Sequence, residues 1–239
     1  MKAAEDNAAT LEEHMRRTYL NVRYGIGIIG AALPFLLWIG ARRLLDSISA
    51  YYYTPMGDVF VGALVSIGVF LYLYKGFSTK ENWALNAAGM LAIGIALVPT
   101  NATGEPHSAR STTHIVFAVL FFLCIAYVAI FRASDTLSLI DEAKRRQNFQ
   151  RIYRVLGLGM AASPVVAIVL AYLFDPDSAA RSLELIVEVL GVWMFAAYWL
   201  VKSSEISETG AERLALEGRI EASPALKNTK AIGHFVRVA

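Results

Sequence analysis

Six apolar runs separated by short polar segments dominate the sequence. Each contains about 16–20 residues, which as an α-helix covers about 24–30 Å, close to the thickness of bilayer hydrocarbon. The pattern therefore predicts an all-α polytopic protein of the cell membrane (the inner membrane in a bacterial source), with six transmembrane helices in one bundle. The predicted spans are 25–41, 59–74, 83–98, 114–131, 155–174 and 183–201, which together form a transmembrane domain over 25–201.

Composition agrees with a membrane protein. Hydrophobic residues make up 56% of the chain and charged residues 18%, whereas soluble domains have about 45–50% and about 25%. The net charge of +2 indicates no partner, but Lys and Arg are unevenly distributed: alternate connecting segments carry 18 and 4 of them. Because basic loops stay in the cytoplasm, both termini are predicted to be cytoplasmic. The basic residues border membrane segments, so we expect no nucleic-acid partner.

Three polar segments flank the spans on the predicted cytoplasmic side. Residues 1–24 show capping-box spacing at Thr10 and Glu13, which favours an amphipathic helix on the membrane surface. Residues 202–239 are expected to form a polar tail. The segment 134–154 is expected to form a surface helix that binds anionic lipid headgroups through Lys144, Arg145, Arg146, Arg151 and Arg154.

Two carboxylates near the outer end of the sixth span form the strongest candidate ligand site. Glu184 and Glu188 stand one helical turn apart, so both project from one face, with Glu188 about 5–8 Å inside the span. An ionisable group at that depth normally faces protein, water or a ligand. Interfacial solvation or a structural ion pair are open alternatives for Glu188, the candidate cations being Arg42, Arg43, Arg110 and Arg181.

Further candidate ligand-binding residues lie on the same predicted side of the membrane. His114 opens the fourth span, Asp58 opens the second, and Asp46 follows the first. Asp58 has a structural alternative, since a carboxylate at a helix N-terminus is favoured by the helix dipole. His107 and His114 with Glu188 have the residue types of a zinc site, although none shows metal-binding spacing within one helix. We therefore expect no bound metal or other cofactor.

The chain resembles a known family in three places. The run Asp46-Ser47-Ile48-Ser49, the segment 96–100 and the position of His114 resemble a bacterial six-span family of unknown function. That family is similar in layout to the Frag/DRAM/Sfk group of membrane proteins. The resemblance implies a six-helix bundle involved in lipid handling or membrane regulation, and it supplies no catalytic residues.

The sequence favours a binding protein over an enzyme. It contains no nucleophile elbow, phosphate-binding loop, dinucleotide fingerprint or zincin helix. We expect an integral membrane protein that binds a lipid or amphipathic small molecule at its outer half without covalent chemistry, as a monomer or a homo-oligomer. A metal-dependent intramembrane hydrolase with an outer His/carboxylate site is one alternative, and a small transporter or channel is another.

Overall fold

The computed structural model describes residues 2–102, 108–173 and 181–216, and all regular secondary structure within them is helical. Four helical segments are long and apolar enough to cross a membrane: Glu13–Ala41, Ala109–Leu139, Ala143–Leu170 and Leu183–Thr209. The elements in chain order are α1 (Lys2–Ala41), η1 (Ser49–Tyr53), α2 (Gly57–Leu73), α3 (Thr79–Leu97), α4 (Ala109–Tyr127), η2 (Val128–Arg132), η3 (Ala133–Leu139), α5 (Ala143–Leu173), α6 (Arg181–Thr209) and α7 (Ala211–Leu216).

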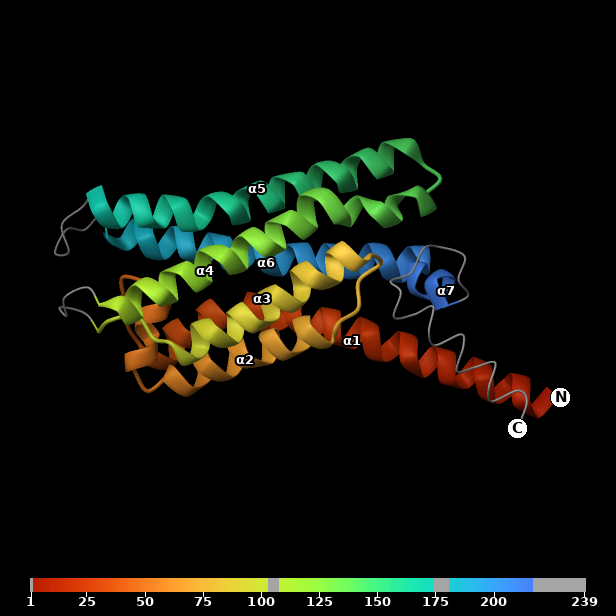
Figure 1. Cartoon of the computed structure of the whole chain (residues 1–239), viewed down its shortest axis with the longest axis horizontal. Helices are drawn as coiled ribbons and strands as arrows, with labels where there is room; N and C mark the ends of the chain where they lie inside the picture. Colours follow the sequence, from red (N-terminus) through yellow and green to blue (C-terminus); the bar gives the residue numbers. More distant parts are fainter. Residues whose placement is uncertain (1, 103–107, 174–180, 217–239) are drawn as a thin grey trace.

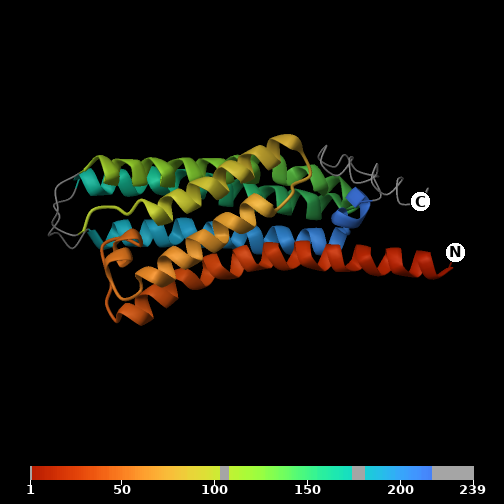
Figure 2. The ribbon, with the colours of Figure 1, turned by 60° about the horizontal axis from the view of Figure 1, so that its bottom comes forward.

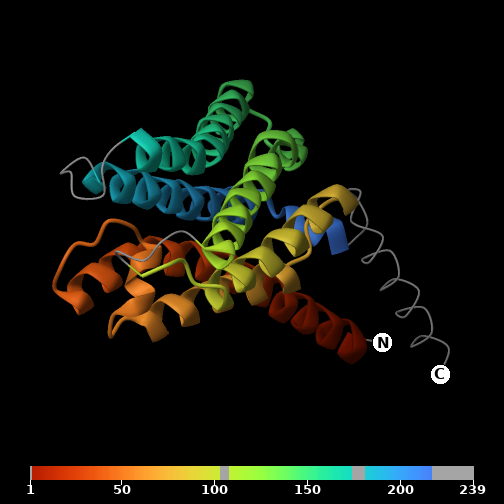
Figure 3. The same ribbon diagram turned by 60° about the vertical axis from the view of Figure 1, so that its left-hand side comes forward.

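The six long helices form a closed ring. Each packs on the next in sequence, and α6 completes the ring by packing on α1 (Figures 1 and 3). Their connections alternate between two ends (Figure 2). We call the end that holds η1 and residues 98–102 the loop end. The opposite end, which holds residues 74–78, η3 and α7, is called the terminal end.

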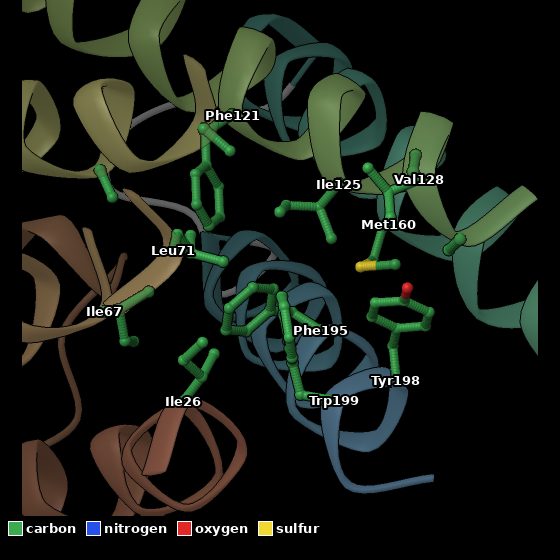
Figure 4. Packing of buried hydrophobic residues seen from close by; sticks show 14 of the residues in the cluster. Ile26, Ile67, Leu71, Phe121, Ile125, Val128, Met160, Phe195, Tyr198 and Trp199 are labelled. Atoms are coloured by element: carbon green, nitrogen blue, oxygen red, sulfur yellow. The ribbon is translucent and has the colours of Figure 1, made fainter. Parts of the chain in front are cut away.

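Large side chains fill the centre of the ring. Ile26 from α1, Phe121 from α4 and Phe195 from α6 converge there (Figure 4). Small residues bring neighbouring helices close: a Cβ on Gly89 of α3 would lie 2.6 Å from the carbonyl oxygen of Gly68 on α2. The core is therefore apolar and closely packed through the middle of the bundle.

Helix α1 differs from the prediction. It runs without a break from Lys2 to Ala41, so the boundary expected between residues 24 and 25 does not exist. Forty residues of α-helix measure about 60 Å, and the N-terminal part extends past the other helices (Figure 1). Polar residues do not stop a helix without a breaker, and Arg23 near the predicted boundary is buried against α6.

Helix α6 also continues past its predicted end. The apolar run ends at residue 201, but the helix extends to Thr209, and Lys202, Ser203 and Glu205 are buried. Residues 202–209 therefore continue α6 and pack in the bundle, beyond the end of the sixth predicted apolar span. The physical reason is that these polar groups find hydrogen-bond partners inside the protein.

The basic segment 134–154 is not one helix. It is divided between η3, a short link and the first turns of α5, which continues directly into the fifth predicted span. Before η3, the end of α4 passes through the π-helical turn η2. The five basic side chains proposed to meet lipid headgroups, namely Lys144, Arg145, Arg146, Arg151 and Arg154, are all exposed. Arg145 also donates to Glu208 on α6 at 2.6 Å.

Candidate functional site

Buried polar groups gather at both ends of the bundle and are scarce between them. The loop-end centre comprises Ile48, Ser49, Val98, His114 and Glu188. The terminal-end centre comprises Arg23, Tyr74, Ala133, Thr136, Tyr153, Lys202, Ser203 and Glu205. Along α6, Glu188 and Lys202 are 14 residues apart, or about 21 Å.

Glu188 holds the loop between α1 and α2 by a single backbone contact. Its Oε2 accepts a hydrogen bond of 2.6 Å from the backbone N–H of Ile48, and the side chain of Ile48 is itself buried. Among the described residues, Glu188 forms no ion pair. The carboxylate therefore fixes the loop through one oxygen, and no described side chain compensates its charge.

The two ring nitrogens of His114 form hydrogen bonds with groups on two different segments of the chain. Its Nδ1 is 2.6 Å from the carbonyl oxygen of Val98, and its Nε2 is 2.8 Å from Oγ of Ser49. A carbonyl oxygen can only accept, so Nδ1 carries the proton of that bond. In the neutral ring Nε2 then accepts from the Ser49 hydroxyl. This arrangement sets both the tautomer and the orientation of the imidazole.

Further hydrogen bonds make the loop rigid. The hydroxyl of Tyr51 donates to the carbonyl of Arg43 at 3.0 Å, and Tyr51 is buried. The hydroxyl of Tyr53 donates to the carbonyl of Thr100 at 2.7 Å, while Arg110 donates to the Tyr53 oxygen at 3.2 Å. The segment joining α1 to α2 is thus folded onto the loop end, where it meets α3, α4 and α6.

The other residues predicted to bind the ligand are less closely associated with the loop-end centre. Glu184 is half-buried one turn from Glu188, whereas Asp46 and Asp58 are exposed. Asp58 lies in the first turn of α2, as its structural alternative requires. His107 lies outside the described residues. Within the described part of the chain, no group of three or more His, Cys, Asp and Glu side chains could hold a metal ion.

The terminal-end centre is built around a buried ion pair. Lys202 donates to Glu205, to Oγ1 of Thr136 at 2.5 Å and to the carbonyl of Ala133 at 2.7 Å. Glu205 also accepts from Thr136 at 2.7 Å and from Tyr153 at 2.8 Å. All donors of the ammonium group are therefore used, and both carboxylate oxygens are occupied.

Arg23 occupies the adjoining space between α1, α2 and α6. Its guanidinium donates to the hydroxyl of Tyr74 and, at 3.4 Å, to Oγ of Ser203. It also lies over two aromatic rings, 4.9 Å from the centroid of Tyr74 and 5.4 Å from that of Trp199. Such cation–π contacts are strongest where water is excluded.

Glu212 on α7 faces the same end of the bundle. Burial raises the pKa of its carboxyl group to about 6, against the opposite influence of Arg23 and Arg16. The short helix α7 packs on both α1 and α6. Ionisation of this carboxyl group near neutral pH is therefore coupled to the packing of α7.

The sequence analysis missed the terminal-end centre. Apart from Tyr74, its polar residues lie just outside the predicted apolar runs, in segments expected to flank the membrane. Helical spacing contained a signal: Trp199, Lys202, Ser203 and Ile206 lie at intervals of three or four, as residues on one face of a continuing helix do. All four are buried.

Comparisons with known proteins identify no relative. No family model, no curated protein and no solved structure matches the chain. The resemblance to the six-span family therefore stays a prediction, and the argument for function depends on the side chains described above.

Proposed function

We propose that this is a six-span protein that binds a lipid or amphipathic small molecule at the loop end, with Glu188 contacting the headgroup. The observation that carries this proposal is the uncompensated carboxylate of Glu188. An ionised group within a membrane helix is costly unless it is paired or solvated. One backbone N–H satisfies only part of its hydrogen-bonding capacity, and no described cation pairs with it.

The ion-pair alternative has little support among the described side chains. Arg42 and Arg43 are exposed and make no ion pair with Glu188 within the described residues. Arg110 points its guanidinium to the hydroxyl of Tyr53. The side chain of Arg181, the fourth candidate cation, lies outside the described part of the structure. A ligand that brings an ammonium or hydroxyl donor would complete the coordination of Glu188, since both groups form hydrogen bonds with carboxylates.

The closed ring of helices supports the proposed membrane arrangement. Helices α2 and α3 have 17 and 19 residues, or about 26 and 29 Å, and lie between helices that are long enough to cross a bilayer. Six spans with cytoplasmic termini also account for the 18-to-4 distribution of Lys and Arg. In this orientation the loop end faces outward, and the exposed basic residues of α5 meet the anionic headgroups of the cytoplasmic leaflet.

Cysteine labelling tests this orientation. In a Cys124→Ser background, Thr112→Cys at the loop end should react with an impermeant maleimide added to intact cells. Arg146→Cys, on the other side, should react only after the cells are opened. Labelling of Thr112→Cys from the cytoplasmic side alone would reverse the orientation and remove the outer site.

Thermal unfolding in detergent tests the ligand site. Phosphatidylethanolamine supplies an ammonium group and phosphatidylglycerol supplies hydroxyls, so each can be added as a defined probe. At least one should raise the melting temperature of the wild type, because a ligand stabilises the state that it binds. This increase should be lost in Glu188→Gln.

Glu184→Gln is the matched control, since it removes the same charge one turn away on the same helix. It should keep the lipid-dependent increase in melting temperature. Equal lipid-dependent melting of Glu188→Gln and the wild type would contradict the proposed role of Glu188.

The alternatives from the sequence have less support. A metal-dependent hydrolase would need three protein ligands close together, and the described residues supply no such group. A transporter or channel would need a polar path, but Phe195, Tyr198 and Trp199 occupy the core between the two polar centres. Near one zinc per purified chain, lost in both His114→Ala and Glu188→Gln, would favour the hydrolase.

A further inference from the structure

The hydrogen-bonded chain Ser49–His114–Val98 has the layout of a nucleophile and its base. The serine oxygen lies 2.8 Å from Nε2, and the second ring nitrogen is 2.6 Å from a carbonyl oxygen. Activated serine nucleophiles require a base within hydrogen-bonding distance and a third group that orients that base. Here the third group is the main-chain carbonyl of Val98.

The orientation of the imidazole suits proton abstraction. Because Nδ1 donates to Val98, the lone pair of the neutral ring is on Nε2 and points to the serine hydroxyl. His114 is only 4% exposed, so its position is set by packing. Ser49 is half-buried, and nearby Leu44 and Tyr53 expose apolar surface at the same end. Ser49 is therefore partly exposed at the loop end of the bundle.

The predicted headgroup site adjoins this pair. Glu188 binds the backbone of Ile48, and the next residue in the chain is Ser49, whose Cα is about 3.8 Å from that of Ile48. The acyl esters of such a lipid lie on its glycerol, beyond the phosphate, so a lipid whose headgroup contacts Glu188 would place them elsewhere on the same loop end, where Ser49 lies. This proximity links binding at Glu188 to chemistry at Ser49.

We propose that Ser49 is a nucleophile and His114 its general base in the cleavage of an acyl ester in an amphiphile. Its choice of substrate rests on the function proposed for Glu188. Oγ of Ser49 attacks the ester carbonyl while Nε2 of His114 takes the hydroxyl proton. The bond from the carbonyl carbon to the alcohol oxygen breaks, the alcohol leaves with that proton, and the acyl group remains on Ser49.

Water completes the cycle. It attacks the acyl–Ser49 ester and gives a proton to His114, the carboxylic acid leaves, and the proton returns to Oγ of Ser49. The products are an alcohol and a fatty acid, and no oxidant or metal ion enters the balance. This reaction would replace the expectation of a purely binding protein.

Covalent labelling tests the proposal directly. The full chain in detergent is treated with an alkyl fluorophosphonate, which forms a stable adduct with activated serines, and the modified residue is located by mass spectrometry. We expect an adduct on Ser49 in the wild type. No adduct on Ser49 in folded wild-type protein would overturn the proposal and leave the pair as a structural link.

Variants separate the two roles. Ser49→Ala should abolish the adduct, and His114→Gln should slow labelling about 100-fold or more, the usual contribution of a general base. Ser47→Ala is the matched control: its Oγ accepts only a local N–H, that of Ala50, and labelling should be unchanged. Equal labelling rates for folded His114→Gln and the wild type would contradict the role of His114.

Fatty-acid release links the reaction to the binding site. Phosphatidylethanolamine or phosphatidylglycerol vesicles with the reconstituted wild type should release fatty acid, whereas those with Ser49→Ala should not. Glu188→Gln should lose lipid-dependent stabilisation, whereas Ser49→Ala should lose fatty-acid release and keep that stabilisation. If Glu188→Gln keeps that stabilisation while Ser49 of the wild type is labelled, the binding role of Glu188 is contradicted and the role of Ser49 as nucleophile is supported.

Discussion

Glu205 at the terminal end accepts hydrogen bonds from Thr136, Tyr153 and Lys202, whereas Glu188 at the loop end accepts one from a described group, the backbone N–H of Ile48. Both carboxylates are on α6. The first is fully buried and paired with a cation, and the second is half-buried without one among the described residues. A carboxylate with saturated contacts fixes packing, while one with unused capacity can bind a ligand.

The largest effect is expected when the buried ion pair between Lys202 and Glu205 is broken. Lys202→Ala leaves Glu205 buried without its cation and should lower the free energy of unfolding by about 3–5 kcal/mol. Unfolding by SDS in mixed micelles measures the change. The exposed Lys144→Ala should change it by less than about 0.5 kcal/mol.

A double variant tests whether the loss comes from the unpaired charge of Glu205. Lys202→Met with Glu205→Leu removes both charges and should cost less than Lys202→Ala alone, because no unpaired charge remains buried. A loss in Lys202→Ala no greater than that in Lys144→Ala would show that the terminal-end centre does not stabilise the fold.

Removal of one hydroxyl should have an intermediate effect. Thr136→Val keeps the shape of the side chain but deletes its hydrogen bonds with Lys202 and Glu205. We expect a loss of about 1.5–3 kcal/mol in the free energy of unfolding, the usual range for hydrogen bonds to charged groups. Thr112→Val is the control, since its exposed hydroxyl bonds only within its own helix. Similar unfolding curves for the two variants would contradict the proposed network.

The loop-end carboxylate should contribute less to stability. Glu188→Gln retains an oxygen that can accept from Ile48, so the free energy of unfolding without added lipid should change by less than about 1 kcal/mol. The same SDS titration measures it. A loss as large as that of Thr136→Val would break the comparison and assign Glu188 a structural role.

The last test is a pH dependence at the terminal end. Glu212 has a pKa of about 6 in the folded chain, above its ordinary value of 4.5, so folding favours its protonated form. Its contribution is therefore fully present below pH 4.5 and declines as the pH rises through 6. Glu212→Gln should show a smaller fall in melting temperature between pH 4.5 and 7 than the wild type. Identical pH profiles would contradict this coupling.

Prediction from the sequence succeeded where the type of a residue left only one environment in which it is stable. Apolar runs of bilayer length predicted six transmembrane helices, and four helical segments within the described residues are long and apolar enough to cross a membrane. Glu188 and His114 were identified because ionisable groups stand out within such runs, and the structure brings them to two consecutive loop residues. Asp46 and Asp58 have the same chemistry but remain exposed, because position along the chain does not specify burial.

The sequence by itself determined the helical class, the apolar character of the ring and the uneven distribution of basic residues, since these properties depend on local composition and spacing. Tertiary structure decided which polar groups meet. Arg23, Tyr153 and Lys202 have the composition of flanking segments, yet they are buried because partners on other helices satisfy them. Likewise, Ser49 became a candidate nucleophile only when its loop folded back onto His114, 65 residues further along the chain.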